Sequence, residues 1–442
     1  MIKEAFRMAW PAVLESFFVS LAGMIDTLMI SSLGPSAVAG VGLTTQPKFI
    51  ALTIFIAINI GISALVARRY GQKNQHSANE IVVTALVFTL IACVIITTIT
   101  VLGADTIIRW CGSNADTHDA GSIYFKVIQL GMIFNVLSLA INAAQRGSGN
   151  TKIAMTTNIT SSIVNIIFNY LLIGGNLGFP KWGVFGAAFA TVLGTFVACV
   201  MSIRSIFKKQ SYISFKYIVD NKIRFQMDTF KSLINLSSNF IIENLVMRIG
   251  FLTTAIMAAK LGTEAFAAHQ VGMNFLNLSF SFGDGMQVAA VALIGRSLGA
   301  KDGTLAKAYG SICQKMGLGI SLVLMVVLFG FGREIFSIFF TEANILDMGS
   351  LIMNFIAITS IFQISQIIFA GALRGAGDAK FTLLGSLISV TIIRTLVTWG
   401  LSGGLINLGL VGIWTGVLSD QLSRFLLFST RYRRGKWINI EI

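Results

Sequence analysis

Four oxygen-bearing side chains lie inside apolar segments in the N-terminal half of this 442-residue chain. They are Asp26 in the first segment, Asn165 and Asn169 in the fifth, and Thr191 in the sixth. An ionised carboxylate at the centre of a bilayer costs about 2.5–3.5 kcal/mol on insertion scales, so such a residue usually faces an interior cavity and has a function there. Oxygen ligands around a single carboxylate suit Na⁺ or a proton relay.

These four residues share one depth in the expected helices. Asp26 and Asn169 each lie about six residues from the same end of their helices, and Thr191 lies about eight residues into its own. Asn165 and Asn169 are four positions apart and therefore lie on one helix face. We interpret the group as a cation-coupling site that could hold Na⁺. The alternative is that Asn and Thr only join helices, at under about 1 kcal/mol for each hydrogen bond.

A second group of charged residues lies in the C-terminal half, nearer the expected midplane. Its members are Glu243, Arg248, Asp284, Arg394 and Asp420. Two interpretations stay open for them: a substrate or second cation site, and a buried network that locks helices together. Glu15, in the inner half of the first helix, is a candidate for the floor of a cleft.

Pro11 lies in the first turns of the first helix, fifteen residues before Asp26. Proline removes one backbone hydrogen bond and permits a bend at that point. A plain helix-start proline is the alternative.

The composition predicts the elements that carry these residues. The chain is 55% hydrophobic and only 12% charged, and its continuous apolar runs favour membrane-spanning helices over a barrel. Twelve spans are expected, at about 9–32, 48–67, 80–103, 122–143, 154–175, 183–206, 233–258, 270–295, 311–332, 348–372, 382–403 and 407–430. The fold class is therefore an all-α polytopic membrane protein.

Lysine and arginine gather in alternate connections between these spans. They include Arg68, Arg69, Lys73, Arg146, Lys152, Lys208, Lys209, Arg296, Lys301, Arg374, Lys380 and Arg431. Bases accumulate on the cytoplasmic side of a membrane, so both termini are expected in the cytoplasm. The expected location of the protein is the cell (plasma) membrane. This placement accounts for the net charge of +14 without nucleic acid as a partner.

The chain repeats itself at a shift of 228 positions. Leu33-Gly34 matches Leu261-Gly262, RGSGNTK at 146–152 matches RGAGDAK at 374–380, and Glu15 matches Glu243. Duplicated halves are typical of secondary transporters, and an even number of spans gives both halves one orientation. We expect two six-helix bundles, 1–206 and 233–442, joined by a cytoplasmic linker at 207–232. Their pseudo-two-fold axis should run along the membrane normal.

Enzyme chemistry is not indicated. The sequence has no G-x-x-x-x-G-K-[ST] phosphate loop and no H-E-x-x-H, and its four cysteines have no C-x-x-C spacing. We expect that the protein is not an enzyme and that it uses no cofactor apart from a coupling ion. A polytopic membrane enzyme would need a metal-ligand or paired-acid motif near a membrane face, and none is visible. A channel is a further alternative, but the two-part repeat favours a transporter that works by alternating access.

Several sequence motifs, together with the candidate site residues named above, make the chain resemble a multidrug and toxic compound extrusion (MATE) transporter. The resemblance covers nearly the full length. It rests on W-P at 10–11, M-I-D-T at 24–27, S-L-G at 32–34, A-V-A-G at 37–40, RGSGNTK at 146–152, N-I-I-F-N at 165–169, G-A-A-F-A-T at 186–191 and GALRGAGDAK at 371–380.

This resemblance implies antiport of cationic amphiphilic drugs against H⁺ or Na⁺. It implies a cation site at Asp26, Asn165, Asn169 and Thr191, and a role for Glu243. The family's partner aspartate in the tenth helix is Gln363 here, which puts a second Na⁺ site in doubt. The helix-1 proline, linked in some members to bending, is Pro11.

The expected partners are small-molecule drugs and membrane lipids, and we expect a monomer. A lipid-linked oligosaccharide flippase of the same superfamily is the alternative function. Cavities of such flippases tend to be rich in bases, whereas only Arg248 and Arg394 are clearly intramembrane in the predicted spans.

Overall fold

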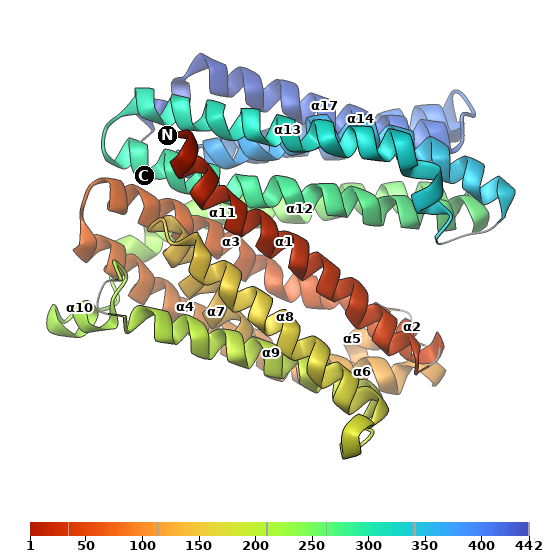
Figure 1. Cartoon of the computed structure of the whole chain (residues 1–442), viewed down its shortest axis with the longest axis horizontal. Helices are drawn as coiled ribbons and strands as arrows, with labels where there is room; N and C mark the ends of the chain where they lie inside the picture. The colour runs from red at the N-terminus through yellow and green to blue at the C-terminus, as the bar shows by residue number, and fades with distance from the viewer. Residues whose placement is uncertain are drawn as a thin grey trace. The chain divides into compact units, whose positions relative to one another are not determined.

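The computed structural model describes residues 1–33, 35–111, 113, 115–208, 211–261, 263–338 and 342–440. All regular structure in these ranges is helical (Figure 1). The repeat residues Gly34 and Gly262 and the linker base Lys209 lie outside the described ranges.

The first six predicted spans correspond to helices. They are α1 (Ile2–Ser31), α3 (Thr45–Gly71), α4 (Gln75–Leu102), the pair α6 (Ala115–Leu130) and α7 (Met132–Gly147), α8 (Thr151–Gly174) and α9 (Gly183–Ile206). Two short helices, α2 (Pro35–Leu43) and α5 (Ala104–Trp110), lie in connections. The predicted span 122–143 is bent by 47° at Gly131, between α6 and α7. The helix α10 (Phe215–Asp220) lies in the predicted linker.

The last six predicted spans also correspond to helices. They are α11 (Met227–Ala259), α12 (Thr263–Gly299), α13 (Gly303–Phe336), α14 (Ala343–Gly375), the composite 379–404 and α17 (Leu410–Arg434). The composite consists of α15 (Ala379–Ser386), a π-helical stretch Leu387–Arg394, α16 (Thr395–Trp399) and a second π-helical stretch Gly400–Gly404. The expected twelve-helix architecture is therefore confirmed.

Length and hydropathy identify most of these helices as spans. In the described ranges eight helices are long and apolar enough to cross a membrane, or nine if the bent pair α6–α7 counts as one. Three long helices, α1, α11 and α17, are not among them. α17 carries Asp420, Arg424 and three arginines in its last turn, and α1 and α11 also carry charged residues.

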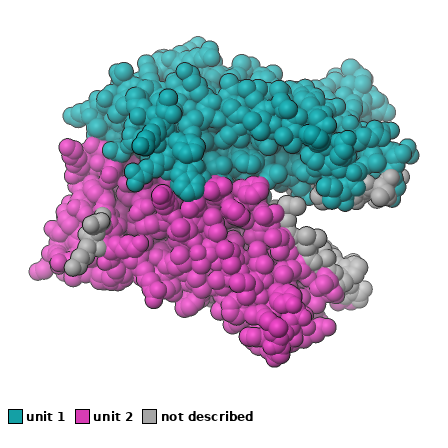
Figure 2. Space-filling model, viewed as in Figure 1, with its two compact units in different colours: residues 1–13, 238–442 teal, residues 14–237 magenta. Residues whose placement is uncertain are grey.

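The chain forms two compact units (Figure 2). Unit 1 comprises Met1–Val13 and Ser238–Ile442, and unit 2 comprises Leu14–Ser237. These bounds differ from the predicted lobes because the first thirteen residues belong to unit 1 and the predicted linker belongs to unit 2.

Packing explains why the first residues of α1 belong to unit 1. Ala5, Met8 and Ala9 are buried in one apolar cluster with Met286 and Leu293 of α12. The α1 carboxylate Glu4 also receives a 2.8 Å hydrogen bond from Arg296 at the end of the same helix. Both apolar burial and an ion pair thus hold this segment on α12.

Small residues let α8 and α9 approach closely in unit 2. Gly186, Ala190, Gly194 and Ala198 are buried at four-residue intervals along α9. A Cβ atom at Gly194 would lie 2.7 Å from the Ser161 backbone oxygen of α8. Such a stripe allows helix backbones to pack against one another in a membrane, and here it brings Asn165 and Thr191 within reach of each other.

We predict that Gly194→Ala destabilises the protein by about 1–3 kcal/mol, because the new methyl group overlaps fixed backbone. Gly319→Ala in α13 is the matched control, since no atom lies within 4 Å of a Cβ atom there. The measurement is the unfolding temperature of each purified variant. Equal stability of the two variants would show that close α8–α9 packing is not required.

Candidate functional site

Asp26 of α1 and Asn169 of α8 form a direct hydrogen bond in unit 2. The Asn169 side-chain amide donates to Asp26 Oδ1. Asn169 is fully buried, whereas Asp26 is half-buried. Within the described ranges, the Asn169 side-chain oxygen is buried and has no hydrogen-bond partner. A carboxylate and an unused amide oxygen therefore lie together, and oxygen pairs of this kind bind Na⁺ or exchange a proton.

Asn165 and Thr191 form the second half of the predicted group. The Asn165 amide donates a 3.0 Å hydrogen bond to Thr191 Oγ1, and the Thr191 hydroxyl donates to the Ala187 carbonyl at 3.1 Å. Tyr124 of α6, which the sequence analysis did not include, is buried in one apolar cluster with Ala187, one helical turn before Thr191. The four predicted residues thus lie in unit 2 as two hydrogen-bonded pairs.

Lys48 is a second residue that the sequence analysis did not include. It lies in the first turn of α3, is half-buried, and interacts electrostatically with Asp26. One signal in the sequence marks it: Lys48 is a lone base at a helix end where the positive-inside pattern predicts few bases. A lysine near the carboxylate can, when protonated, compete with a mobile cation for Asp26.

Glu243 pairs with Arg374 inside unit 1. Glu243 accepts hydrogen bonds from Arg374 at 2.7 Å and from Ser386 at 2.7 Å, and its second oxygen accepts one from Thr382 at 3.2 Å. Glu243 is 1% exposed and Arg374 9%. The predicted basic turn at 374–380 therefore supplies the counter-ion of the helix-7 glutamate. We call this ion pair the Glu243 latch.

Unit 2 contains the same arrangement around Glu15. Arg146 donates to Glu15 Oε1, and the Asn158 amide donates to the same oxygen. Arg146 and Asn158 precede Arg374 and Ser386 by 228 positions, the shift that relates Glu15 to Glu243. Glu15 is thus engaged in an ion pair within unit 2 and is not brought together with the C-terminal group. We call this ion pair the Glu15 latch.

Asp284 and Gln363 take different places in unit 1. Gln287 donates to Asp284 at 3.2 Å and accepts from Arg374 at 2.9 Å, so Asp284 is connected to the Glu243 latch through one side chain. The Gln363 amide donates to the Leu276 backbone oxygen at 3.4 Å. Gln363 is buried and bonded to backbone at the position where the resemblance implies an aspartate.

Arg394 and Asp420 belong to a separate buried network. Arg394 donates to Asp420 at 3.4 Å and to Thr254 at 2.9 Å, and Arg424 donates to Asp420 at 2.9 Å. The expectation of only two intramembrane arginines was wrong, because Arg424 is also buried within α17. The sequence signal for Arg424 was its position four residues after Asp420, which places both side chains on one face of the helix.

The remaining predicted residues are Arg248 and Pro11. Arg248 is exposed on α11, and Pro11 is buried within the continuous helix α1. The predicted C-terminal group is therefore divided into two buried networks and one exposed base, while Glu15 belongs to unit 2. A bend at Pro11 stays a prediction.

Comparison with known proteins gives a consistent result for both halves. The MatE family model matches residues 11–171 and 240–399, one match in each half. The chain belongs to the MatE family. It is a multi-pass membrane protein of a transporter family, as its apolar helices and this match together require.

Three relatives place this MatE chain more closely. It is 29% identical to a probable multidrug resistance protein NorM of Thermotoga maritima, over 98% of this chain and 93% of the relative. It is 24% identical to the uncharacterized transporter YisQ of Bacillus subtilis, over 98% and 94%. A solved outward-facing multidrug resistance MATE family transporter has a TM-score of 0.91 at 21% identity, covering 98% of this chain and 96% of that one.

We predict that Glu243→Gln destabilises this MatE protein by about 3–5 kcal/mol, because it leaves the Arg374 charge buried without its counter-ion. The double variant Glu243→Gln/Arg374→Gln should lose less than the sum of the two single variants. The unfolding temperature can be followed with a thiol-reactive dye, since Cys93, Cys199 and Cys313 are buried in the folded protein. Strict additivity of the two substitutions would contradict a Glu243 latch.

Proposed function

We propose that this protein is a secondary active multidrug efflux antiporter. It exports cationic amphiphilic compounds in exchange for H⁺ or Na⁺ by alternating access. It lies in the plasma membrane, and both of its termini are in the cytoplasm. Family membership and relatives named as multidrug resistance proteins support the substrate class.

The observation that carries the proposal is the state of Asp26. In the described ranges, the helix carboxylates Glu15, Glu243 and Asp420 each pair with arginine, and Asp26 makes no arginine ion pair. Its neighbours are an amide with an unused oxygen and the charge of Lys48. An acid in this setting can exchange a small cation, whereas an acid held by arginine is already neutralised.

Exchange at Asp26 can drive transport because it changes the charge of the site. One elementary charge that crosses a membrane potential of about 100 mV supplies about 2.3 kcal/mol. Since about 1.4 kcal/mol corresponds to a factor of ten, that energy supports about a fortyfold gradient of an exported compound that carries no net charge. A monovalent cation that leaves in one-to-one exchange meets the same electrical cost, so its export is driven by the concentration gradient of the coupling ion. The coupling ion therefore needs no further chemistry than reversible binding at this carboxylate.

The buried arginines favour drug export over the flippase alternative. Oligosaccharide carriers are anionic, so a flippase cavity needs bases that are free to bind phosphate. Arg374 and Arg394 are instead paired with Glu243 and Asp420.

We predict that Asp26→Asn abolishes drug efflux while the protein still reaches the membrane, because the amide keeps the shape of the carboxyl group and loses its charge. The measurement is ethidium accumulation in cells that express each variant at equal level. Asp105→Asn is the control: Asp105 is an exposed acid in α5, and Ser122 and Lys126 lower its pKa. Normal efflux by Asp26→Asn would refute the proposal.

Lys48→Met should increase the affinity of the transporter for its coupling cation several-fold, because the competing fixed charge is lost. The expected result is a lower half-saturating ion concentration in proteoliposome transport, with a reduced maximal rate since the cation leaves more slowly. Lys126→Met, on the exposed Asp105 ion pair, serves as the matched control. An unchanged ion dependence in Lys48→Met would exclude competition at Asp26.

A further inference from the structure

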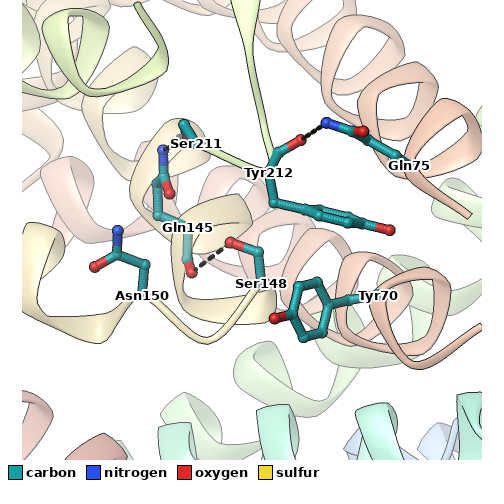
Figure 3. Close-up of a pocket in the computed structure, with 7 residues that line it drawn as sticks. All are labelled: Tyr70, Gln75, Gln145, Ser148, Asn150, Ser211 and Tyr212. Atoms are coloured by element: carbon teal, nitrogen blue, oxygen red, sulfur yellow. Dashed lines mark hydrogen bonds between the residues drawn. The ribbon is translucent and has the colours of Figure 1, made fainter. Parts of the chain in front are cut away.

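A polar pocket lies at one end of unit 2, away from the Asp26 group. It has a volume of about 430 Å³ and is lined by Tyr70, Gln75, Gln145, Ser148, Asn150, Ser211 and Tyr212 (Figure 3). These residues come from the end of α3, the start of α4, the α7–α8 turn and the linker after α9. All of these segments lie on the side that the basic connections predict to be cytoplasmic. The volume is within the range of small-molecule sites.

The lining is rich in hydrogen-bond donors and contains no carboxylate. Gln75 and Gln145 are held in place, since Gln75 donates to the Tyr212 carbonyl at 2.9 Å and Gln145 donates to Ser211 at 3.3 Å. Figure 3 shows the Tyr70 ring below Tyr212. The two rings pack edge to face, with their centroids 4.6 Å apart. Burial raises the pKa of Tyr212, so its hydroxyl stays a neutral donor.

Positive charge lies next to the lining residues in the sequence. Two long helices, α4 and α8, begin at its lining residues. The Asn74 side chain caps α4 by accepting a 3.0 Å hydrogen bond from the Ser77 N–H, whereas the side chain of Asn150 does not cap α8. Helix N-termini present unpaired N–H groups and a partial positive charge. Lys73, Lys152 and Lys208 lie within three residues of the lining and are exposed. An anion is therefore the favoured ligand.

The equivalent place in unit 1 is closed. At the 228-position shift, Tyr70, Gln145 and Ser148 correspond to Leu298, Leu373 and Ala376. These three residues are buried in one apolar cluster with Trp437 of the C-terminal segment.

The other two helix-end positions of the lining are closed as well. A Cβ atom at Gly303, the counterpart of Gln75, would lie 2.6 Å from Ile438. Asp378, the counterpart of Asn150, accepts a 2.7 Å hydrogen bond from Arg431. If these positions served only as scaffold, apolar packing would suffice in both halves. The polar, open pocket of unit 2 therefore differs from its counterpart in unit 1 in a way that the scaffold does not require.

We propose that this pocket binds a phosphate-bearing polar group, in which the hydroxyls of Ser211 and Tyr212 and the amide of Asn150 donate to the phosphate oxygens. Two sources share this chemistry: the headgroup of an anionic phospholipid of the cytoplasmic leaflet, and a soluble organic phosphate. Bases on the cytoplasmic side attract such headgroups, and here they are the exposed lysines that flank the polar lining. A bound phosphate would join the two helix turns to the linker, independently of the proposed transport function.

The test uses the full-length protein in a neutral detergent at constant ionic strength. Dioctanoyl phosphatidylglycerol, glycerol 3-phosphate and uncharged dioctanoylglycerol are titrated separately, and the unfolding temperature reports binding. Asn150→Asp places one negative charge in the pocket at an exposed position, so folding is preserved. Asn176→Asp makes the same change at the opposite end of α8, about 36 Å away for a helix of 24 residues.

The expected result is saturable stabilisation of the wild type by phosphatidylglycerol. Asn150→Asp should weaken apparent affinity at least tenfold and Asn176→Asp less than twofold. Equal binding of glycerol 3-phosphate identifies a soluble ligand, and binding of the lipid alone identifies the headgroup; either supports the proposal. Stabilisation that is equal for uncharged dioctanoylglycerol, or equal loss of affinity in both variants, would overturn it.

Discussion

Neutralising buried carboxylates is the constraint on which this structure depends. A charge inside a membrane protein is costly unless a counter-ion and hydrogen bonds accompany it. Glu15, Glu243 and Asp420 meet this requirement with arginines in the same unit. Asp26 is satisfied differently: it accepts a hydrogen bond from the Asn169 amide and, in the described ranges, makes no arginine ion pair, which is why we propose it as the binding place of a mobile cation.

The repeat separates scaffold from function. The Glu15 and Glu243 latches recur at one shift, and each joins the first helix of its half to the last turn of the fourth. An interaction retained in both halves is best understood as part of the scaffold. The Asp26 group and the polar pocket each occur in one half, because Asp26 matches Thr254 and Gln145 matches Leu373.

Much of the fold could be predicted from sequence, since spans of about 20 apolar residues and the 228-residue repeat are strong signals. The N-terminal group was predictable because a lone acid and spaced asparagines share one depth. The C-terminal group was not, because depth along a helix does not specify the face on which a residue lies. Arg374 was assigned to a cytoplasmic turn, and only the structure shows it reaching Glu243. Lys48 was missed because it lies at the very start of its predicted span, 48–67, where a base is usually exposed to water.

If ion exchange at Asp26 powers export, an imposed ion gradient must drive it. The decisive measurement is transport of ethidium by purified protein in liposomes, with the membrane potential clamped and ΔpH and ΔNa⁺ imposed separately. We expect that one of these two gradients accelerates export by the wild type, and that this acceleration saturates with ion concentration. Export at the same rate with either gradient and with neither would contradict it.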